Sequence, residues 1–132
     1  MICEPLRGWR HVRVTERRTW RDWAECIKEL VDAHYPEAET INLVVDNLNT
    51  HSGASLYETF PPEEARRLLD RLEIHPTPKH GSWLDMAELE LRIMNRQCLD
   101  RRLDEAAVVR REVGIWEGDR NKRGCRIHWT FT

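Results

Sequence analysis

The sequence lacks a long hydrophobic segment and has few cysteines. No apolar stretch opens the chain, so we expect neither a signal peptide nor a membrane span. The four cysteines, Cys3, Cys26, Cys98 and Cys125, form no C-x-x-C pair and have no histidine at ligand spacing. Zinc ribbons and redox motifs are therefore unsupported. Thiols without a disulfide pattern are typical of a reducing cytosol, so we expect a cytoplasmic protein.

A strong overall charge is also missing, because the net charge at pH 7 is −2. The composition therefore has no global basic signature of a nucleic-acid-binding protein. The charge is nevertheless uneven, since residues 92–132 hold ten Arg and Lys against six Asp and Glu, an excess of four positive charges. Such a segment indicates either an ordinary solvated helix surface or a phosphate-binding face.

The chain has neither an internal repeat nor a low-complexity linker, and its 132 residues suit one domain with a real core. Residues 9–15 alternate apolar and basic side chains, which predicts a half-exposed strand near a sheet edge. Thr19 can cap a helix that ends near His34, before Pro36. Ile41–Val45 is too hydrophobic for an edge strand and predicts a buried, parallel strand.

The middle of the chain predicts two short helices and a strand. Residues 52–60 and 62–72 have helical patterns, and Pro62 suits the first turn of the second helix. Residues 73–77 suit a short strand.

The last part of the chain predicts two longer helices, which start at Ser82 and at about Asp104, each with an apolar stripe at helical spacing. Residues 126–131 alternate again and suit a final strand or an extended arm. The resulting order β-α-β-α-α-β-α-α predicts an α/β fold. The stripes consist of Leu84, Ala87, Leu91, Met94 and Cys98, and of Ala106, Val109, Val113 and Trp116.

Asp46 ends the apolar strand and is followed at once by Asn47. Ligand sites of α/β sheets lie at the C-terminal ends of parallel strands. A buried, unpaired carboxylate would be costly there, which favours a metal ion or a basic partner. Asp46 could instead cap a turn with Asn47 and Asn49, and the local sequence leaves both possibilities open.

Glu88 lies one position past Ala87 of the apolar stripe, so it flanks the predicted buried face, whereas we expect Glu90 to be rotated further towards solvent. An ion pair with Arg92, four residues later, is the purely structural alternative. Asp46 and Glu88 together would be the minimal carboxylate pair for two divalent ions roughly 3.5–4 Å apart, which activate a water or hydroxyl and stabilise a leaving oxygen. Mg²⁺, or Mn²⁺, suits such oxygen ligands.

Two stretches, VVDNLNTH at residues 44–51 and the run from residue 56 to residue 102, resemble the C-terminal part of DDE-superfamily insertion-sequence transposases, in the mariner-like branch. The resemblance extends from about Glu4 to Phe131, and its most specific pieces are the strand ending in Asp46 and the S-W-L-x-x-x-E segment. It implies a ribonuclease-H-like fold in which three acids bind two Mg²⁺ ions for DNA nicking and strand transfer. By the same resemblance, Asp46 is the second acid and Glu88 the third.

The chain departs from this family in two respects. Where the family usually has Asn, the chain has Asp85, which implies an extra negative charge beside the metal site. The family's first acid belongs to a strand before residues 9–15, and the one imaginable substitute, Glu16, lies in a polar ERRT turn. The resemblance therefore predicts a partial catalytic domain over residues 1–132. This domain would lack the first central strand and an N-terminal DNA-recognition domain, and would be inactive on its own.

Several basic residues are candidates for contacts to the DNA backbone, which would be salt-dependent and independent of base sequence. His51, five residues after Asp46, could also reach the site, although a histidine beside a turn is as well explained structurally. The candidates for DNA contact are Lys79, His80, Arg101, Arg102, Arg110 and Arg111.

Three functions remain open from the sequence. The first is a two-metal endonuclease and strand-transfer domain that acts on transposon ends. It would take its third carboxylate from an upstream transposase polypeptide or from readthrough of an upstream frame. The second is a non-catalytic fragment that binds DNA or pairs with intact transposase, and the third is a pseudogene product without a function. The expected partners are DNA and a second transposase chain, which includes a homodimer, and the expected location on DNA is the nucleoid.

Overall fold

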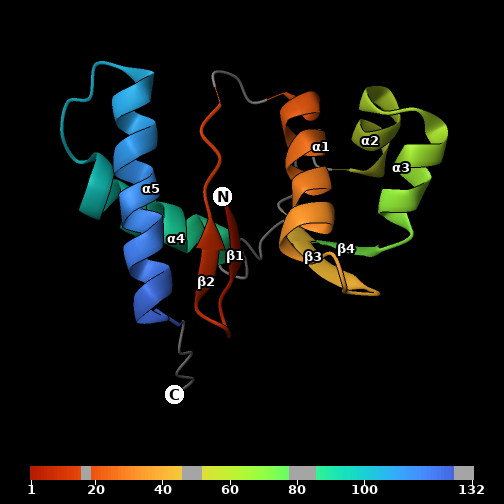
Figure 1. The fold of residues 1–132 in the computed structure, drawn as a ribbon, viewed down its shortest axis with the longest axis horizontal. Helices are drawn as coiled ribbons and strands as arrows, with labels where there is room; N and C mark the ends of the chain where they lie inside the picture. Colours follow the sequence, from red (N-terminus) through yellow and green to blue (C-terminus); the bar gives the residue numbers. More distant parts are fainter. Residues whose placement is uncertain (16–18, 46–51, 78–85, 127–132) are drawn as a thin grey trace. The chain divides into compact units, whose positions relative to one another are not determined.

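The computed structural model describes residues 1–15, 19–45, 52–77 and 86–126 as a mixed α/β chain (Figure 1). The expected α/β class is thereby confirmed. The elements, with η for a π-helical turn, are β1 (Ile2–Glu4), β2 (Trp9–His11), α1 (Trp20–Glu29), η1 (Leu30–His34), β3 (Ile41–Val45), α2 (Gly53–Thr59), α3 (Pro62–Leu69), β4 (Leu72–Pro76), α4 (Met86–Met94), η3 (Asn95–Leu99) and α5 (Ala106–Arg123).

The chain divides into two compact units. The two-segment unit consists of Met1–Val14 and Met86–Thr132, which are far apart in the sequence. The one-segment unit is the continuous stretch Thr15–Asp85. The assignment of all 132 residues to a single domain stays a prediction.

The first helix of the one-segment unit begins with a reciprocal cap. The Asp22 backbone N–H donates to Thr19 Oγ1 over 3.2 Å, and the Thr19 N–H donates to Asp22 Oδ2 over 3.1 Å. Two of the backbone donors at the helix start are satisfied in this way. Because α1 continues into η1, the predicted helix from Thr19 to His34 is confirmed.

The sheet of this unit pairs β3 with β4 in parallel, from Ile41 opposite Leu72 to Val45 opposite Pro76. The predicted parallel strand is confirmed, but its predicted complete burial is wrong. Exposure alternates along β3, so that Val45 is 7% exposed and Val44 is 54% exposed. Within the described residues this sheet has two strands and one covered face, and that is why the hydrophobic run did not imply burial on both sides.

The remaining elements of the one-segment unit agree closely with the sequence patterns. Helix α2 lies within residues 52–60, α3 starts at Pro62 and ends three residues before the expected end, and β4 lies one residue earlier than expected. The buried core consists of Ala24, Ile27, Leu30, Val31, Val45, Leu56, Ala65 and Leu68.

The two-segment unit begins with the antiparallel hairpin β1–β2, in which Ile2 pairs with His11. The sequence pattern did not predict β1, because three residues are too short for a periodic signal, and it predicted a strand up to Thr15, four residues beyond the end of β2. Gly8 in the hairpin turn has a φ of 77°, and a Cβ atom there would lie 2.6 Å from the carbonyl C and O of Gly124. Glycine is therefore required where the turn meets the end of α5.

The core of this unit confirms most of the two predicted stripes. Met94 and Cys98 from α4 and η3 pack with Val113 and Trp116 of α5. The Trp116 indole N–H donates to Gln97 Oε1 over 3.0 Å. Residue 84 of the first stripe and residues 127–131 of the predicted final strand lie outside the described residues.

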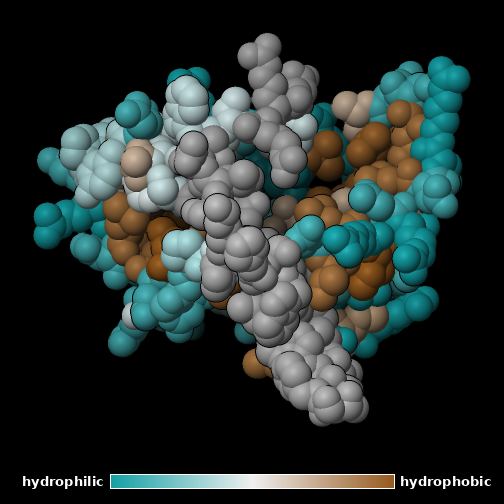
Figure 2. Space-filling model, turned by 180° about the vertical axis from the view of Figure 1, so that it is seen from behind, coloured by the Kyte–Doolittle hydropathy of each residue, from teal (hydrophilic) through white to brown (hydrophobic). Residues whose placement is uncertain are grey.

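Apolar side chains also reach the surface, where Figure 2 shows hydrophobic patches between hydrophilic residues on the face turned away from Figure 1. The most exposed large ones are Leu6 at 78% and Ile115 at 61%. No helix among the described residues combines the length and the apolar character needed to cross a membrane.

Candidate active site

The ends of the two parallel strands β3 and β4 lie side by side. The predicted acid Asp46, which follows β3 in the sequence, lies outside the described residues. Strand β3 ends at Val45, the residue before Asp46, and the Val45 carbonyl accepts a hydrogen bond from the Thr77 N–H over 2.8 Å. The C-terminal ends of β3 and β4 thus meet at one edge of the sheet, where α/β proteins bind ligands. The candidates outside the described residues are Asp46, Lys79, His80 and Asp85, together with Glu16, Asn47, Asn49 and His51.

Glu88 lies in the first turns of α4, with its side chain 47% exposed. Arg92 Nη2 lies 3.5 Å from Glu88 Oε1, so the helix-flank ion pair that the sequence left open is present. The Arg92 side chain is 72% exposed, and ion pairs of this kind contribute only about 0–1 kcal/mol. A divalent cation can therefore compete with Arg92 for the Glu88 carboxylate.

The prediction for Glu90 was wrong, because its side chain is completely buried. Arg120 Nη2 donates to Glu90 Oε1 over 2.9 Å, and Arg10 Nε lies 3.3 Å from Glu90 Oε2. The second contact is electrostatic, since its geometry is not that of a hydrogen bond. We call these three residues the buried ion cluster. It contains two cations and one anion, in surroundings where Arg10 is also completely buried.

The backbone and the side chain of Arg10 are both held by hydrogen bonds to residues in α5 and just after it. The Arg10 N–H donates to Asn121 Oδ1 over 2.8 Å, and Asn121 Nδ2 donates to the Arg10 carbonyl over 2.7 Å. The Arg10 guanidinium donates to the Cys125 carbonyl, and the Val12 N–H donates to Glu117 Oε1. Side chains of α5 therefore occupy the edge of β2 that faces away from β1, which agrees with the edge position expected from the sequence.

A signal for the buried ion cluster was present in the sequence. In the strand predicted over residues 9–15, Arg10 would share a face with Val12 and Val14, and both valines pack against the core of the two-segment unit. Glu90 precedes Leu91, a member of the apolar stripe. The pattern could not show that these charges meet, because Arg10 and the residues in and just after α5 that bind it are up to 115 positions apart.

The opposite environments of the two glutamates follow from helix geometry. At 3.6 residues per turn, side chains two positions apart point roughly 200° away from each other around the axis. When Glu90 is turned into the buried ion cluster, Glu88 is turned towards solvent. Among the described acids of α4, Glu88 is therefore the one whose carboxylate can reach a ligand in solution.

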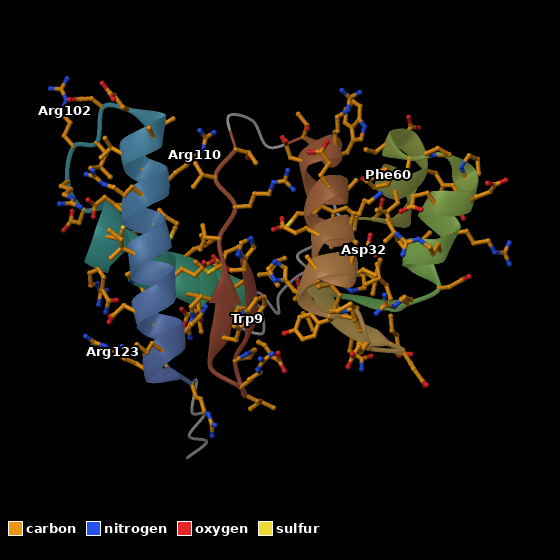
Figure 3. All side chains as sticks on the ribbon, in the orientation of Figure 1. Trp9, Asp32, Phe60, Arg102, Arg110 and Arg123 are labelled. Carbon is orange, nitrogen blue, oxygen red and sulfur yellow. The ribbon has the colours of Figure 1, made fainter. Side chains whose placement is uncertain are left out.

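Three of the four arginines predicted to contact DNA are engaged in surface ion pairs. Arg101 Nη2 lies 2.9 Å from Glu112, Arg102 Nε lies 2.8 Å from Asp104, and Arg111 Nη2 lies 3.5 Å from Glu112. Arg102 projects away from the loop before α5 (Figure 3). Arg110 is exposed and has no ion pair within the part of the chain that the structure describes. These weak pairs leave the arginines able to turn to phosphates instead.

Comparison with models of protein families gives one match, to the family described as DDE superfamily endonuclease, over residues 1–109. The matched range contains Asp46, Glu88 and Glu90 and ends within the first turns of α5. No curated protein and no solved structure matches the chain.

Proposed function

The chain belongs to the DDE superfamily of endonucleases, and we propose that it provides the C-terminal part of a catalytic domain for DNA nicking and strand transfer in transposition. The mixed α/β chain is consistent with the ribonuclease-H-like fold of such nucleases. Nuclease domains of this superfamily act on DNA, and the superfamily generally uses divalent metals. An origin in an insertion sequence and a place in the mariner-like branch are part of the proposal, supported by the motifs in residues 44–51 and 82–88.

The observation that carries this proposal is that the Glu88 carboxylate on α4 is exposed, whereas Glu90, the other described acid of this helix, is buried. Glu90 is unsuited as a metal ligand because both of its carboxylate oxygens face arginines. Glu88 offers carboxylate oxygens, which are the donors that Mg²⁺ and Mn²⁺ prefer, and Asp46 would offer the same donors from the end of β3. Ions held by these residues would activate a water or hydroxyl and stabilise the leaving oxygen.

A third carboxylate is needed for the complete set of acids implied by the family resemblance. We assign no described residue to this role, and we propose that an upstream transposase polypeptide supplies it. Without that polypeptide, we expect the chain to bind metal and DNA but to nick DNA slowly or not at all. The DNA contacts would come from Lys79, His80, Arg101, Arg102, Arg110 and Arg111, in the cytoplasm and on the nucleoid.

The test compares the parent chain with Glu88→Gln, Asp46→Asn and a matched control, Asp119→Asn. Asp119 resembles Glu88, since its side chain is 54% exposed and it pairs with an arginine four residues later over 3.2 Å. Mn²⁺ binding is measured by electron paramagnetic resonance of free Mn²⁺, DNA binding by gel shift, and nicking on supercoiled plasmid with Mg²⁺. We expect weaker Mn²⁺ binding in the first two variants, parent-like Mn²⁺ binding in the control and unchanged DNA binding in all.

Nicking in the parent that disappears in Glu88→Gln and Asp46→Asn would mean that the chain is active without a further acid. Mn²⁺ binding without nicking in the parent supports the need for a third carboxylate. Mn²⁺ binding that is equal in the parent and in Glu88→Gln would refute the proposed site. DNA binding that persists in that case would favour the non-catalytic, DNA-binding alternative.

A further inference from the structure

The N-terminal half of α4, which carries Glu88, makes a buried charged contact in addition to the hydrophobic contacts of the same helix. Met94 and Cys98 anchor the other end of the α4–η3 helix in the core with Val113 and Trp116. Among the described side chains from Ala87 to Met94, Glu90 is the only one that is completely buried, and it lies two residues from Glu88. Glu90 therefore fixes the rotation of this half of the helix together with Leu91 and Ile93, which follow it in α4 and pack against the core.

We propose that the buried ion cluster of Arg10, Glu90 and Arg120 is a positioning device that orients Glu88 towards the metal. This inference rests on the proposed function, because it assumes that Glu88 is a ligand. The three residues themselves touch neither metal nor DNA in this proposal. They are positioning residues that act through the rotation of α4.

The cluster is suited to this role because two arginines from different elements contact the Glu90 carboxylate. Arg10 comes from β2 and approaches Oε2, while Arg120 comes from α5 and donates to Oε1. A helix that rotated by one residue, about 100°, would leave two guanidinium groups buried without an anion. A hydrophobic contact would tolerate such a rotation more readily, because it has no preferred direction.

Both arginines make further contacts, although Arg10 Nε, Glu90 Oε2 and Arg120 Nε have no hydrogen-bond partner among the described residues. Arg10 is fixed by Asn121 and by the Cys125 carbonyl, and Arg120 lies over the Trp116 ring at 5.5 Å from the ring centroid. A polar network whose members are mutually oriented specifies one arrangement of the elements that contribute to it. Here these elements are β2, α4 and α5.

The test uses substitutions that keep the charges, because Glu90→Gln would leave both guanidinium groups without an anion. Glu90→Asp shortens the side chain, so that one carboxylate cannot reach both arginines in the parent geometry. Arg120→Lys keeps the charge but loses the planar donor group. The stability control is Val113→Ala, which opens the same core away from the cluster, since Val113 is 2% exposed.

Two readouts are taken on the full chain. The first is the Mn²⁺ concentration at half saturation, and the second is hydrogen exchange of the α4 amides without metal. We expect Glu90→Asp and Arg120→Lys to weaken Mn²⁺ binding about tenfold or more, as is typical when the partner that orients a metal ligand is changed. We expect Val113→Ala to bind Mn²⁺ like the parent despite its lower melting temperature.

Hydrogen exchange adds a readout that does not depend on metal. We expect the amides of residues 87–90 to exchange faster in Glu90→Asp than in Val113→Ala. If Glu90→Asp and Arg120→Lys bind Mn²⁺ as the parent does, the positioning role is overturned while the proposed site stands. If Glu88→Gln also binds as the parent does, the proposed site itself has failed, and the inference fails with it.

Discussion

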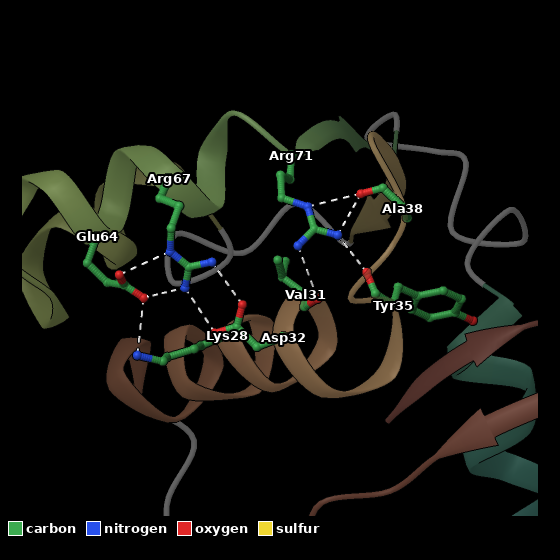
Figure 4. Close-up of polar contacts among 8 residues, drawn as sticks. All are labelled: Lys28, Val31, Asp32, Tyr35, Ala38, Glu64, Arg67 and Arg71. Atoms are coloured by element: carbon green, nitrogen blue, oxygen red, sulfur yellow. Dashed lines mark hydrogen bonds and ion pairs between the residues drawn. The ribbon is translucent and has the colours of Figure 1, made fainter.

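The two units of this protein are both held by arginine–carboxylate contacts, but they place them in opposite environments. In the two-segment unit, Arg10 and Glu90 are completely buried. In the one-segment unit, Arg67 is 44% exposed and bridges Asp32 and Glu64, and Lys28 pairs with the same Glu64 oxygen, Oε1, over 3.1 Å (Figure 4). Arginine–carboxylate pairs therefore lie in the interior of the two-segment unit, whereas in the one-segment unit they join helical segments at the surface.

The difference shows how burial changes the role of an ion pair. A surface pair is solvated in both partners whether or not it forms, so its loss costs little. A buried pair has given up its hydration, so that each partner depends on the other for compensation. The exposed network can therefore be remodelled with little consequence, whereas the buried ion cluster must be complete.

The largest loss of stability is expected when the buried ion cluster loses its anion. Glu90→Gln leaves Arg10 and Arg120 without their anion, and we expect the free energy of unfolding to fall by about 3–5 kcal/mol, as for other buried pairs that lose one partner. Urea unfolding followed by tryptophan fluorescence measures this loss. The matched variant is Glu64→Gln in the exposed network, and equal losses in the two variants would contradict the comparison.

A partly buried arginine of the one-segment unit is expected to have an intermediate effect. Arg71 donates to the Val31 carbonyl over 3.4 Å, to the Ala38 carbonyl over 3.0 Å and also to the Tyr35 carbonyl (Figure 4). It thus satisfies backbone acceptors in η1 and in the turn after it, where the Tyr35 carbonyl also accepts from the Ala38 N–H over 3.3 Å.

We expect Arg71→Ala to lower the free energy of unfolding by about 1–3 kcal/mol, because the Val31 and Ala38 carbonyls lose their hydrogen bonds from Arg71. Urea unfolding measures this loss. Arg71→Lys should recover part of it, since a lysine can reach one acceptor but lacks the forked donor group. Recovery to the full parent value would show that charge alone matters at this position.

The smallest effect is expected in the exposed network, and it should depend on pH. Hydrogen bonds from Arg67 and from Lys28 lower the pKa of Glu64 from 4.5 to about 2, and a hydrogen bond from Arg67 also lowers the pKa of Asp32. Because the folded pKa values are depressed, this stabilisation is present above pH 4.5 and is lost as the pH falls towards 2.

We therefore expect Arg67→Gln to lower the melting temperature slightly at pH 7, by an amount that vanishes near pH 2 and shrinks in 1 M salt, where the Debye length is about 3 Å. The control is Arg66→Gln, because Arg66 is an exposed neighbour on α3 without an ion pair among the described residues. Melting followed by circular dichroism from pH 7 to pH 2 measures both. A decrease that is independent of pH would show that the network does not act through these carboxylates.

The elements of the one-segment unit were predictable because their signals are local. The Thr19 cap, Pro62 at the start of α3 and the hydrophobic run of β3 each depend on residues within one or two turns or within one strand. The two-segment unit was predicted less well, since β1 was missed and Glu90 was assigned to solvent. There, the deciding contacts join residues 30 to 115 positions apart.

For the candidate site, the sequence by itself determined the family resemblance and the proposal of Asp46 and Glu88 as its two acids, because the motifs around these residues are contiguous. It also determined the spacing of Glu88 and Glu90, and hence that the two face different ways. Which of them would be buried was decided only by the tertiary structure. Burial of Glu90 requires two cations in one place, and β2 and α5 bring Arg10 and Arg120 to it only when the ends of the chain fold together.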